Sequence, residues 1–120
     1  MDGRPAVWIG HAVLPVADLD ESADYWRDLG MREVERNPNV AVLELRGGTH
    51  LVLVPGEPEA GAAAPFDLMV EDLDATHREW DARGLAPSAI ERGRIHSSFT
   101  VRDPNGYAIT ISSSHVVGEV

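Results

Sequence analysis

The sequence contains no cysteine and no lysine. The absence of cysteine excludes disulfide bonds, thiolate nucleophiles and metal sites built from thiolates. All ten basic residues are arginine, which also excludes Schiff-base chemistry on a lysine side chain. The side chains that remain available for chemistry are those of His, Asp, Glu, Ser, Thr, Tyr and Arg.

Long apolar runs and positive charge are also scarce. No segment approaches the roughly 18 apolar residues of a membrane span, and no signal-like start of basic then apolar residues is present. By default we therefore expect a cytoplasmic protein with no membrane partner. Twenty acidic residues against ten basic ones give a formal net charge of −10, which would repel a polyanion, so no nucleic-acid partner is expected.

One stretch of the chain occurs twice, with a constant offset of 80 − 26 = 54 residues. A second stretch repeats more loosely, at an offset of 106 − 48 = 58 residues. The repeat predicts one domain over 1–120, made of module one at about 5–55 and module two at about 65–115, with a Pro/Gly/Ala-rich linker between them. Paired half-sheets normally close around a shared cleft, where a function is expected. The matched pairs in the first stretch are Val16 and Val70, Asp18 and Asp72, Leu19 and Leu73, Asp20 and Asp74, Trp26 and Trp80, Gly30 and Gly84, and Met31 and Leu85.

Each module is expected to run strand, helix, then two or three strands. Residues 8–16 are apolar and β-branched, as in a strand. Asp18, with Glu21 three residues later, predicts a helix start, and Gly30 predicts its end. The second copy repeats this from Asp72 to Gly84. Further strands are predicted at 40–45, 49–54, 97–102 and 107–112, with turns at RGG (46–48) and DPNG (103–106).

Alternation along the strands assigns their side chains to two faces. One face is uniformly apolar and is expected to meet the helices; it carries Ala12, Leu14, Val16, Leu51, Leu53, Phe66, Leu68, Val70, Ile109 and Ile111. The other face carries the polar residues and is expected to line the cleft. That second face carries His11, Val13, Pro15, His50, Val52, Pro65, Asp67, Met69, Ala108, Thr110 and Ser112, to which Glu44, His96, Ser98 and Thr100 are added by extension.

Two motifs, HAVLPVADLDESADYWRDLGM near the start and FTVRDPNGYAITI near the end, make the chain resemble the vicinal oxygen chelate superfamily. This superfamily holds glyoxalase I, extradiol dioxygenases, fosfomycin-resistance proteins and bleomycin-resistance proteins. The resemblance covers nearly the whole chain. It implies an α+β fold in which two tandem βαβββ modules form a curved mixed sheet around a cup-shaped cleft, usually within a homodimer.

The resemblance also implies where a metal would lie. Metal-dependent members place one ligand on the first and one on the last strand of each module, and these positions fall on His11, Val52, Pro65 and Thr110 of this chain. Only His11 matches, whereas a catalytic metal generally takes about three protein ligands. We therefore expect no metal or other cofactor at the family position, and a divalent ion (Zn, Ni, Mn or Fe) belongs to an alternative with a different ligand set.

Two residues of the cleft face are candidates for catalysis. His11 is a candidate because it lies at a metal-ligand position of the family that the chain resembles. The competing interpretation is a structural histidine that is hydrogen-bonded to the backbone. Asp67 is a carboxylate in an otherwise apolar strand, so it must be solvated, paired or functional. His50 and His96, with Glu44, could add a relocated metal site or an acid/base pair. The predicted ligand-binding residues are His11, Val13, His50, Val52, Asp67, Met69, His96 and Thr110.

The sequence thus leaves two function classes open. The first is a metal-free protein that binds a small apolar or aromatic molecule, similar to bleomycin-resistance proteins. The second is a glyoxalase-like lyase or isomerase, or a dioxygenase, with a non-standard ligand set. Whether the protein is an enzyme is left open. Trp26, Trp80 and Phe99 are expected in the core and not in the site.

Overall fold

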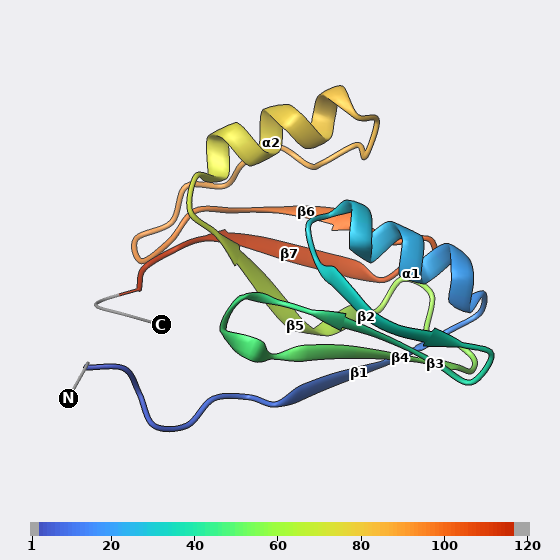
Figure 1. Ribbon diagram of the computed structural model, residues 1–120. Helices are drawn as coiled ribbons and strands as arrows, with labels where there is room; N and C mark the ends of the chain where they lie inside the picture. Colours follow the sequence, from blue (N-terminus) through green and yellow to red (C-terminus); the bar gives the residue numbers. More distant parts are fainter. Residues whose placement is uncertain (1–2, 117–120) are drawn as a thin grey trace.

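The computed structural model of the protein describes residues 3–116. Figure 1 shows two sheets, each accompanied by one helix. Module one contains β1 (His11–Val16), α1 (Leu19–Asp28), β2 (Arg32–Asn37), β3 (Val40–Glu44), a short 3-10 turn (Arg46–Gly48) and β4 (His50–Pro55). Module two contains β5 (Ala63–Val70), α2 (Leu73–Ala82), β6 (Ser98–Arg102) and β7 (Ala108–Ser113).

The two sheets follow the same pairing scheme, although the first has one strand more than the second. The strand order is β1-β4-β3-β2 in the first and β5-β7-β6 in the second. In each, the module's first strand pairs in parallel with its last strand, and the remaining pairs are antiparallel. The predicted α+β fold of two repeated modules is therefore confirmed, with the strands divided between two sheets.

The two modules differ after their helices. Module one has β2 after α1, whereas the described residues 86–97 of module two form only an isolated bridge between Glu91 and Ser98. This segment carries Pro87 and Gly93 and lacks the alternation of a strand. The carbonyl oxygen of His96 leaves no room for a β-carbon at position 93. Module two therefore closes with two strands and a long loop.

The linker is shorter than the composition indicates, because β5 begins at Ala63. Ala63 pairs with Ala108, and the Ala108 amide donates to the Ala62 carbonyl at 2.9 Å. The alanines from position 63 onward, which the composition assigns to the linker, thus form the start of strand β5. The connection between β4 and β5 comprises residues 56–62.

Both helices begin at the predicted aspartates. The Asp18 carboxylate accepts a hydrogen bond from the Glu21 amide at 3.0 Å, and the Asp72 carboxylate accepts one from the Ala75 amide at the same distance. These bonds satisfy amides that a helix start leaves unpaired. Gly30 and Gly84 follow the helices with positive φ, as predicted for residues that end a helix.

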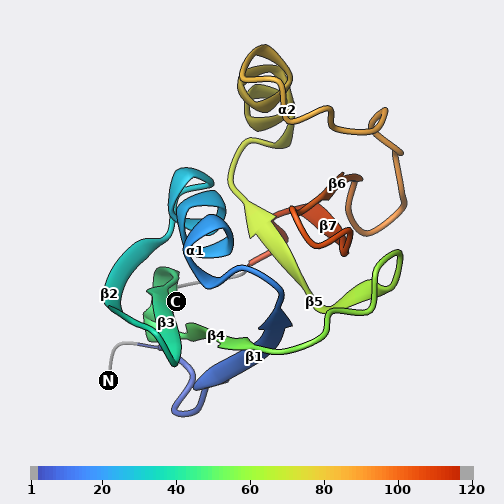
Figure 2. The ribbon, with the colours of Figure 1, turned by 90° about the vertical axis from the view of Figure 1, so that its right-hand side faces the viewer.

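The core lies on the helix-facing sides of the sheets. Leu14, Val16, Leu51, Leu53, Ile109 and Ile111 are all buried, as are Trp26, Trp80 and Phe99, so the alternation and the core assignments are confirmed. Figure 2 shows α1 above the first sheet with β5 beside it, and α2 above β6 and β7. The Trp26 ring packs against Phe66 of the other module, with ring centroids 5.9 Å apart.

Polar contacts also join the two modules. Asn105, in the DPNG turn, accepts from the Ala17 amide at 3.0 Å and donates to the Ser22 hydroxyl at 3.1 Å. The Tyr107 hydroxyl donates to the Pro15 carbonyl at 3.1 Å, and the Tyr25 hydroxyl donates to the Arg102 carbonyl at 3.3 Å. The turn of module two therefore holds the start of α1 in module one.

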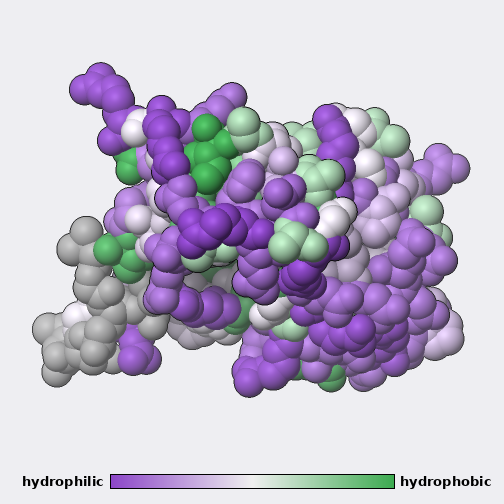
Figure 3. Space-filling model, turned by 90° about the horizontal axis from the view of Figure 1, so that it is seen from above, coloured by the Kyte–Doolittle hydropathy of each residue, from purple (hydrophilic) through white to green (hydrophobic). Residues whose placement is uncertain are grey.

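Seen from above, the face over the helices is mainly hydrophilic, with scattered apolar patches (Figure 3). Within residues 3–116, no helix has both the length and the apolar character that a membrane crossing requires.

Candidate functional site

A cavity of about 440 Å³ lies between the two modules. Its volume is in the range of pockets that hold small molecules. Most of its lining is apolar. The lining comes from β1, β4 and β5, from the turns after α1 and after β3, and from the segments before β1 and after β7. The apolar lining residues are Ile9, Ala12, Met31, Leu45, Leu51, Phe66, Leu68, Met69, Val70 and Val116.

The cavity draws much of its lining from the helix-facing side of the sheets. Ala12, Leu51, Phe66 and Leu68 belong to that side, whereas the sequence predicted a cleft on the opposite face. Strand alternation assigns a side chain to a face but does not say which face the other module will cover. Here the modules approach through their helix-facing sides, and the space between them stays open where α1 does not fill it.

Two predicted ligand-binding residues, Asp67 and Met69, line this cavity. Both lie on β5, the outermost strand of the second sheet, where both faces border the space between the modules. The Ser112 hydroxyl of β7 donates to the Asp67 carboxylate at 3.3 Å. Thr110 pairs with Asp67 across the same two strands but is exposed and lies outside the lining.

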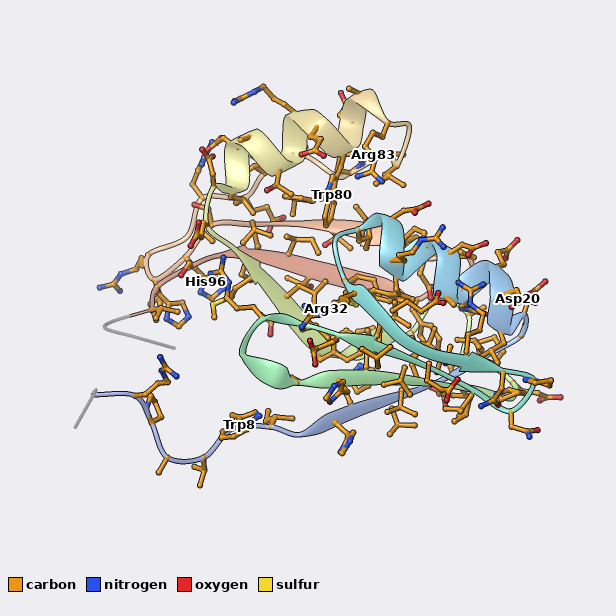
Figure 4. The ribbon with its side chains drawn as sticks, in the orientation of Figure 1. Trp8, Asp20, Arg32, Trp80, Arg83 and His96 are labelled. Carbon is orange, nitrogen blue, oxygen red and sulfur yellow. The ribbon has the colours of Figure 1, made fainter. Side chains whose placement is uncertain are left out.

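Charged groups gather at the turn after β3. Arg46 lines the cavity, and its guanidinium forms an ion pair with Glu71 at 3.1 Å, just beyond the end of β5. Trp8 lies beside this turn, because its indole nitrogen would be 3.6 Å from a β-carbon at Gly48. Figure 4 shows Trp8 on the segment that leads into β1, and 67% of this residue is exposed. Of these groups, Arg46 itself lines the cavity, and the Trp8 ring lies beside the same turn.

A second group of predicted residues crosses the outer face of the first sheet. His11, His50, Glu44 and Arg32 are register partners across β1, β4, β3 and β2. The rings of His11 and His50 stack with centroids 5.9 Å apart, and His50 Nε2 lies 3.1 Å from Glu44 Oε2. Arg32 forms an ion pair with Glu44. The row is a continuous chain of titratable groups, in which Glu44 orients the His50 ring.

The remaining predicted residues lie elsewhere. Val13 and Val52 are register partners beside the histidine row on the outer face. His96 lies on the loop before β6, well separated from Trp8 in Figure 4, and its ring stacks on that of His115 at 5.8 Å. The eight residues predicted to share one cleft are therefore divided among the cavity, the outer face of the first sheet, the outer face of the second sheet, and a loop.

The residues present do not fit the metal site that the family resemblance implies. Val52 has no donor atom, and Pro65 cannot bind a metal through its side chain. Within the part of the chain that the structure describes, no three His, Asp or Glu side chains are grouped closely enough to hold a metal ion. His11, His50 and Glu44 therefore form a connected row in this structure and not a preformed metal centre.

Sequence reasoning missed most of the cavity lining. Ile9, Leu45, Arg46 and Thr49 lie at strand ends and in a turn, where alternation carries no information about which element will lie opposite. One sequence signal could have indicated Arg46, because it is a charged residue directly before two glycines. Both glycines adopt positive φ in the structure. Such a turn exposes its first side chain near the neighbouring strand ends.

Comparison with known proteins agrees with this architecture. A family model described as Glyoxalase/Bleomycin resistance protein/Dioxygenase superfamily matches residues 8–111. No curated protein matches the chain significantly in sequence.

Solved structures share the fold at low sequence identity. A lactoylglutathione lyase from Agrobacterium tumefaciens is similar with 20% identity and a TM-score of 0.75, covering 92% of this chain and 96% of its own. A glyoxalase/bleomycin resistance protein/dioxygenase from Alicyclobacillus acidocaldarius is similar with 22% identity and a TM-score of 0.73, covering 94% of this chain and 96% of its own. A bleomycin resistance determinant encoded on the transposon Tn5 is similar with 20% identity and a TM-score of 0.70, covering 92% of this chain and 100% of its own. Because the family model spans nearly the whole of both modules, the chain belongs to the Glyoxalase/Bleomycin resistance protein/Dioxygenase superfamily.

Proposed function

We propose that this protein binds a small apolar or aromatic molecule in the cavity between its modules, without a metal ion. The observation that carries the proposal is the cavity itself, which has a volume of about 440 Å³ and a mainly apolar lining. Burying an apolar molecule there is favourable by roughly 25 cal/mol for each Å² removed from water. A bleomycin resistance determinant is among the proteins of similar fold, which is consistent with a binding role.

Binding of Nile red, an uncharged apolar dye, tests this proposal. We expect its fluorescence to rise on addition of the protein, and the unfolding temperature to rise with dye concentration. The substitution Ala12→Phe places a ring in the cavity lining and should weaken dye binding at least about tenfold, or 1.4 kcal/mol. The matched variant Ala89→Phe adds the same ring at an exposed position outside the lining and should bind as the wild type does. Equal binding by both variants would contradict the proposal.

A second candidate function is a glyoxalase-like lyase or isomerase, or a dioxygenase, and one observation favours it. His11, His50 and Glu44 form a connected row on the outer face of the first sheet, with His11 at the family position. Elemental analysis of the purified protein, repeated after incubation with Zn²⁺, Ni²⁺, Mn²⁺ or Fe²⁺, separates the two candidates. A near-stoichiometric metal that is lost in His11→Ala would favour the second candidate over the first.

We also propose that the protein is a homodimer and that it is cytoplasmic. Support for the dimer is an exposed apolar strip, Val7, Trp8, Ile9 and Val13, along the segment leading into β1 and along β1 itself, the outermost strand of its sheet. Exposed apolar strips next to an edge strand commonly mark interfaces. Light scattering should give twice the monomer mass, and Ile9→Ser should shift the protein toward the monomer. A wild-type monomer would contradict the dimer.

A further inference from the structure

The cavity lining carries one positive and one negative side chain, which do not pair with each other. Arg46 and Asp67 are the two charged lining residues within the described chain. The guanidinium of Arg46 forms its ion pair with Glu71, which lies outside the lining, and not with Asp67. The only side-chain partner that the described chain offers to Asp67 is the neutral Ser112 hydroxyl, and no arginine or histidine of residues 3–116 lies within ion-pairing distance of it. The lining therefore carries one carboxylate without a counterion.

The position of this carboxylate constrains what the cavity can hold. Asp67 is an exposed residue of β5 that borders the cavity, and its neighbours along the strand, Phe66, Leu68 and Met69, contribute apolar side chains to the same lining. Covering a carboxylate with an apolar molecule removes its water and costs several kcal/mol unless a hydrogen-bonding cation replaces that water. A neutral or anionic ligand that fills the cavity next to Asp67 incurs this cost, whereas a ligand with a cationic group avoids it.

Two other features favour a cation at this place. The net charge of −10 attracts cations at long range and repels anions. The Phe66 ring is part of the same lining, and an aromatic face adds attraction for a cation. The apolar remainder of the lining still requires an apolar or aromatic body on the ligand.

We propose that the ligand of this cavity is an apolar or aromatic amine whose ammonium group is bound by the Asp67 carboxylate. This inference rests on the proposed function of the cavity as a binding site, and it adds the charge of the ligand and the residue that selects it. Ser112 serves as a positioning residue, because its hydroxyl holds one carboxylate oxygen and leaves the other available to the ammonium group.

Three probes of one skeleton test the proposal by calorimetry. They are phenylbutylamine, phenylbutanol and phenylbutyrate, which share an apolar body and carry a cation, no charge and an anion. We expect the amine to bind at least about tenfold more tightly than the alcohol, and the acid to bind more weakly than the alcohol. Raising the salt concentration should weaken binding of the amine and leave that of the alcohol unchanged.

Variants locate the selectivity. Asp67→Asn should reduce amine binding to the level of the alcohol while the alcohol binds as before, and Asp67→Glu should keep most of the preference. Asp81→Asn on α2 removes the same charge outside the lining and should leave the preference intact. Nile red binding and a thermal melt confirm that each variant is folded and keeps its cavity.

The outcomes separate this inference from the proposed function. If the alcohol and Nile red bind but the amine has no advantage, or if its advantage survives Asp67→Asn, the amine proposal is overturned and the binding function stands. If no probe and no dye binds, both are overturned.

Discussion

At the scale of single residues, Tyr25 on α1 lies in an environment that changes its acidity. Its hydroxyl donates to the Arg102 carbonyl of the other module at 3.3 Å. Burial, and secondarily the negative charge of Asp103, raise the pKa of Tyr25 to about 12 from the usual 10.0. The folded protein therefore binds the phenol proton more tightly than the unfolded chain does.

This shift predicts how stability changes at alkaline pH. The stabilisation linked to Tyr25 is fully present below the unfolded pKa of 10.0 and is lost as the pH rises from there through about 12. Urea unfolding midpoints of the wild type should fall over this range, and those of Tyr25→Phe should fall less steeply. Near neutral pH the variant should be less stable by about 1 kcal/mol, because the Arg102 carbonyl loses its donor. Parallel alkaline limbs in the two proteins would refute the assignment.

At the scale of elements, the two helices begin with the same N-cap interaction. Asp18 and Asp72 each accept a hydrogen bond from the amide three residues later, both at 3.0 Å. Asp18→Ala and Asp72→Ala should therefore each cost about 1 kcal/mol of stability, and the double variant about twice as much, because the caps lie in separate modules. Chemical denaturation of the four proteins checks this. A loss confined to one of the caps would show that the two starts are not equivalent.

Elements also show what sequence reasoning can and cannot do here. The repeat, the caps and the alternation predicted the helices and six of the seven strands because each depends on local chemistry. β2 was not located, since its sequence REVERN has mostly charged side chains that are exposed in the structure. It is held by pairing with β3 and by an ion cluster in which Arg36 joins Asp20 and Asp24 of α1 to Glu33, and neither contact has a local signature.

The candidate site was predicted only in part for a related reason. Asp67 could be singled out as an unusual carboxylate because its apolar neighbours are visible in the sequence, and it lines the cavity; its role there stays a prediction. The cavity's position was not predictable, because it depends on how two modules dock and not on either module alone. The ligand roles of His11, His50 and His96 stay predictions.

At the scale of the whole molecule, the DPNG turn fastens one module to the other. Asn105 reaches Ala17 and Ser22 across 88 and 83 positions of sequence, and Asp103 is buried beside it and accepts bonds from Asn105 and Tyr107. A turn motif that reads as local chemistry thus serves the interface between the repeats.

This fastening predicts that the chain unfolds as one unit. Thermal unfolding of the wild type should show a single transition, with equal calorimetric and van't Hoff enthalpies. Asn105→Ala leaves the Ala17 amide without its acceptor and should lower stability by about 1–3 kcal/mol. Asn39→Ala is the control, because Asn39 lies in the β2–β3 turn and its backbone amide bonds within that turn, to Asn37; this variant should change stability much less. Two resolved transitions in the wild type would show that the modules are energetically separate.

The parallel pairing of first and last strands has a consequence for how the chain is made. β1 pairs with β4, so His11 meets His50 only after 50 − 11 = 39 further residues have left the ribosome. β5 meets β7 after a similar wait, with Asp67 and Thr110 separated by 110 − 67 = 43 residues. Such distant contacts are slow to form, since the closure entropy of the loop comes before any gain from pairing. The opening strand of each module therefore stays unpaired during synthesis until the closing strand of the same module has been made.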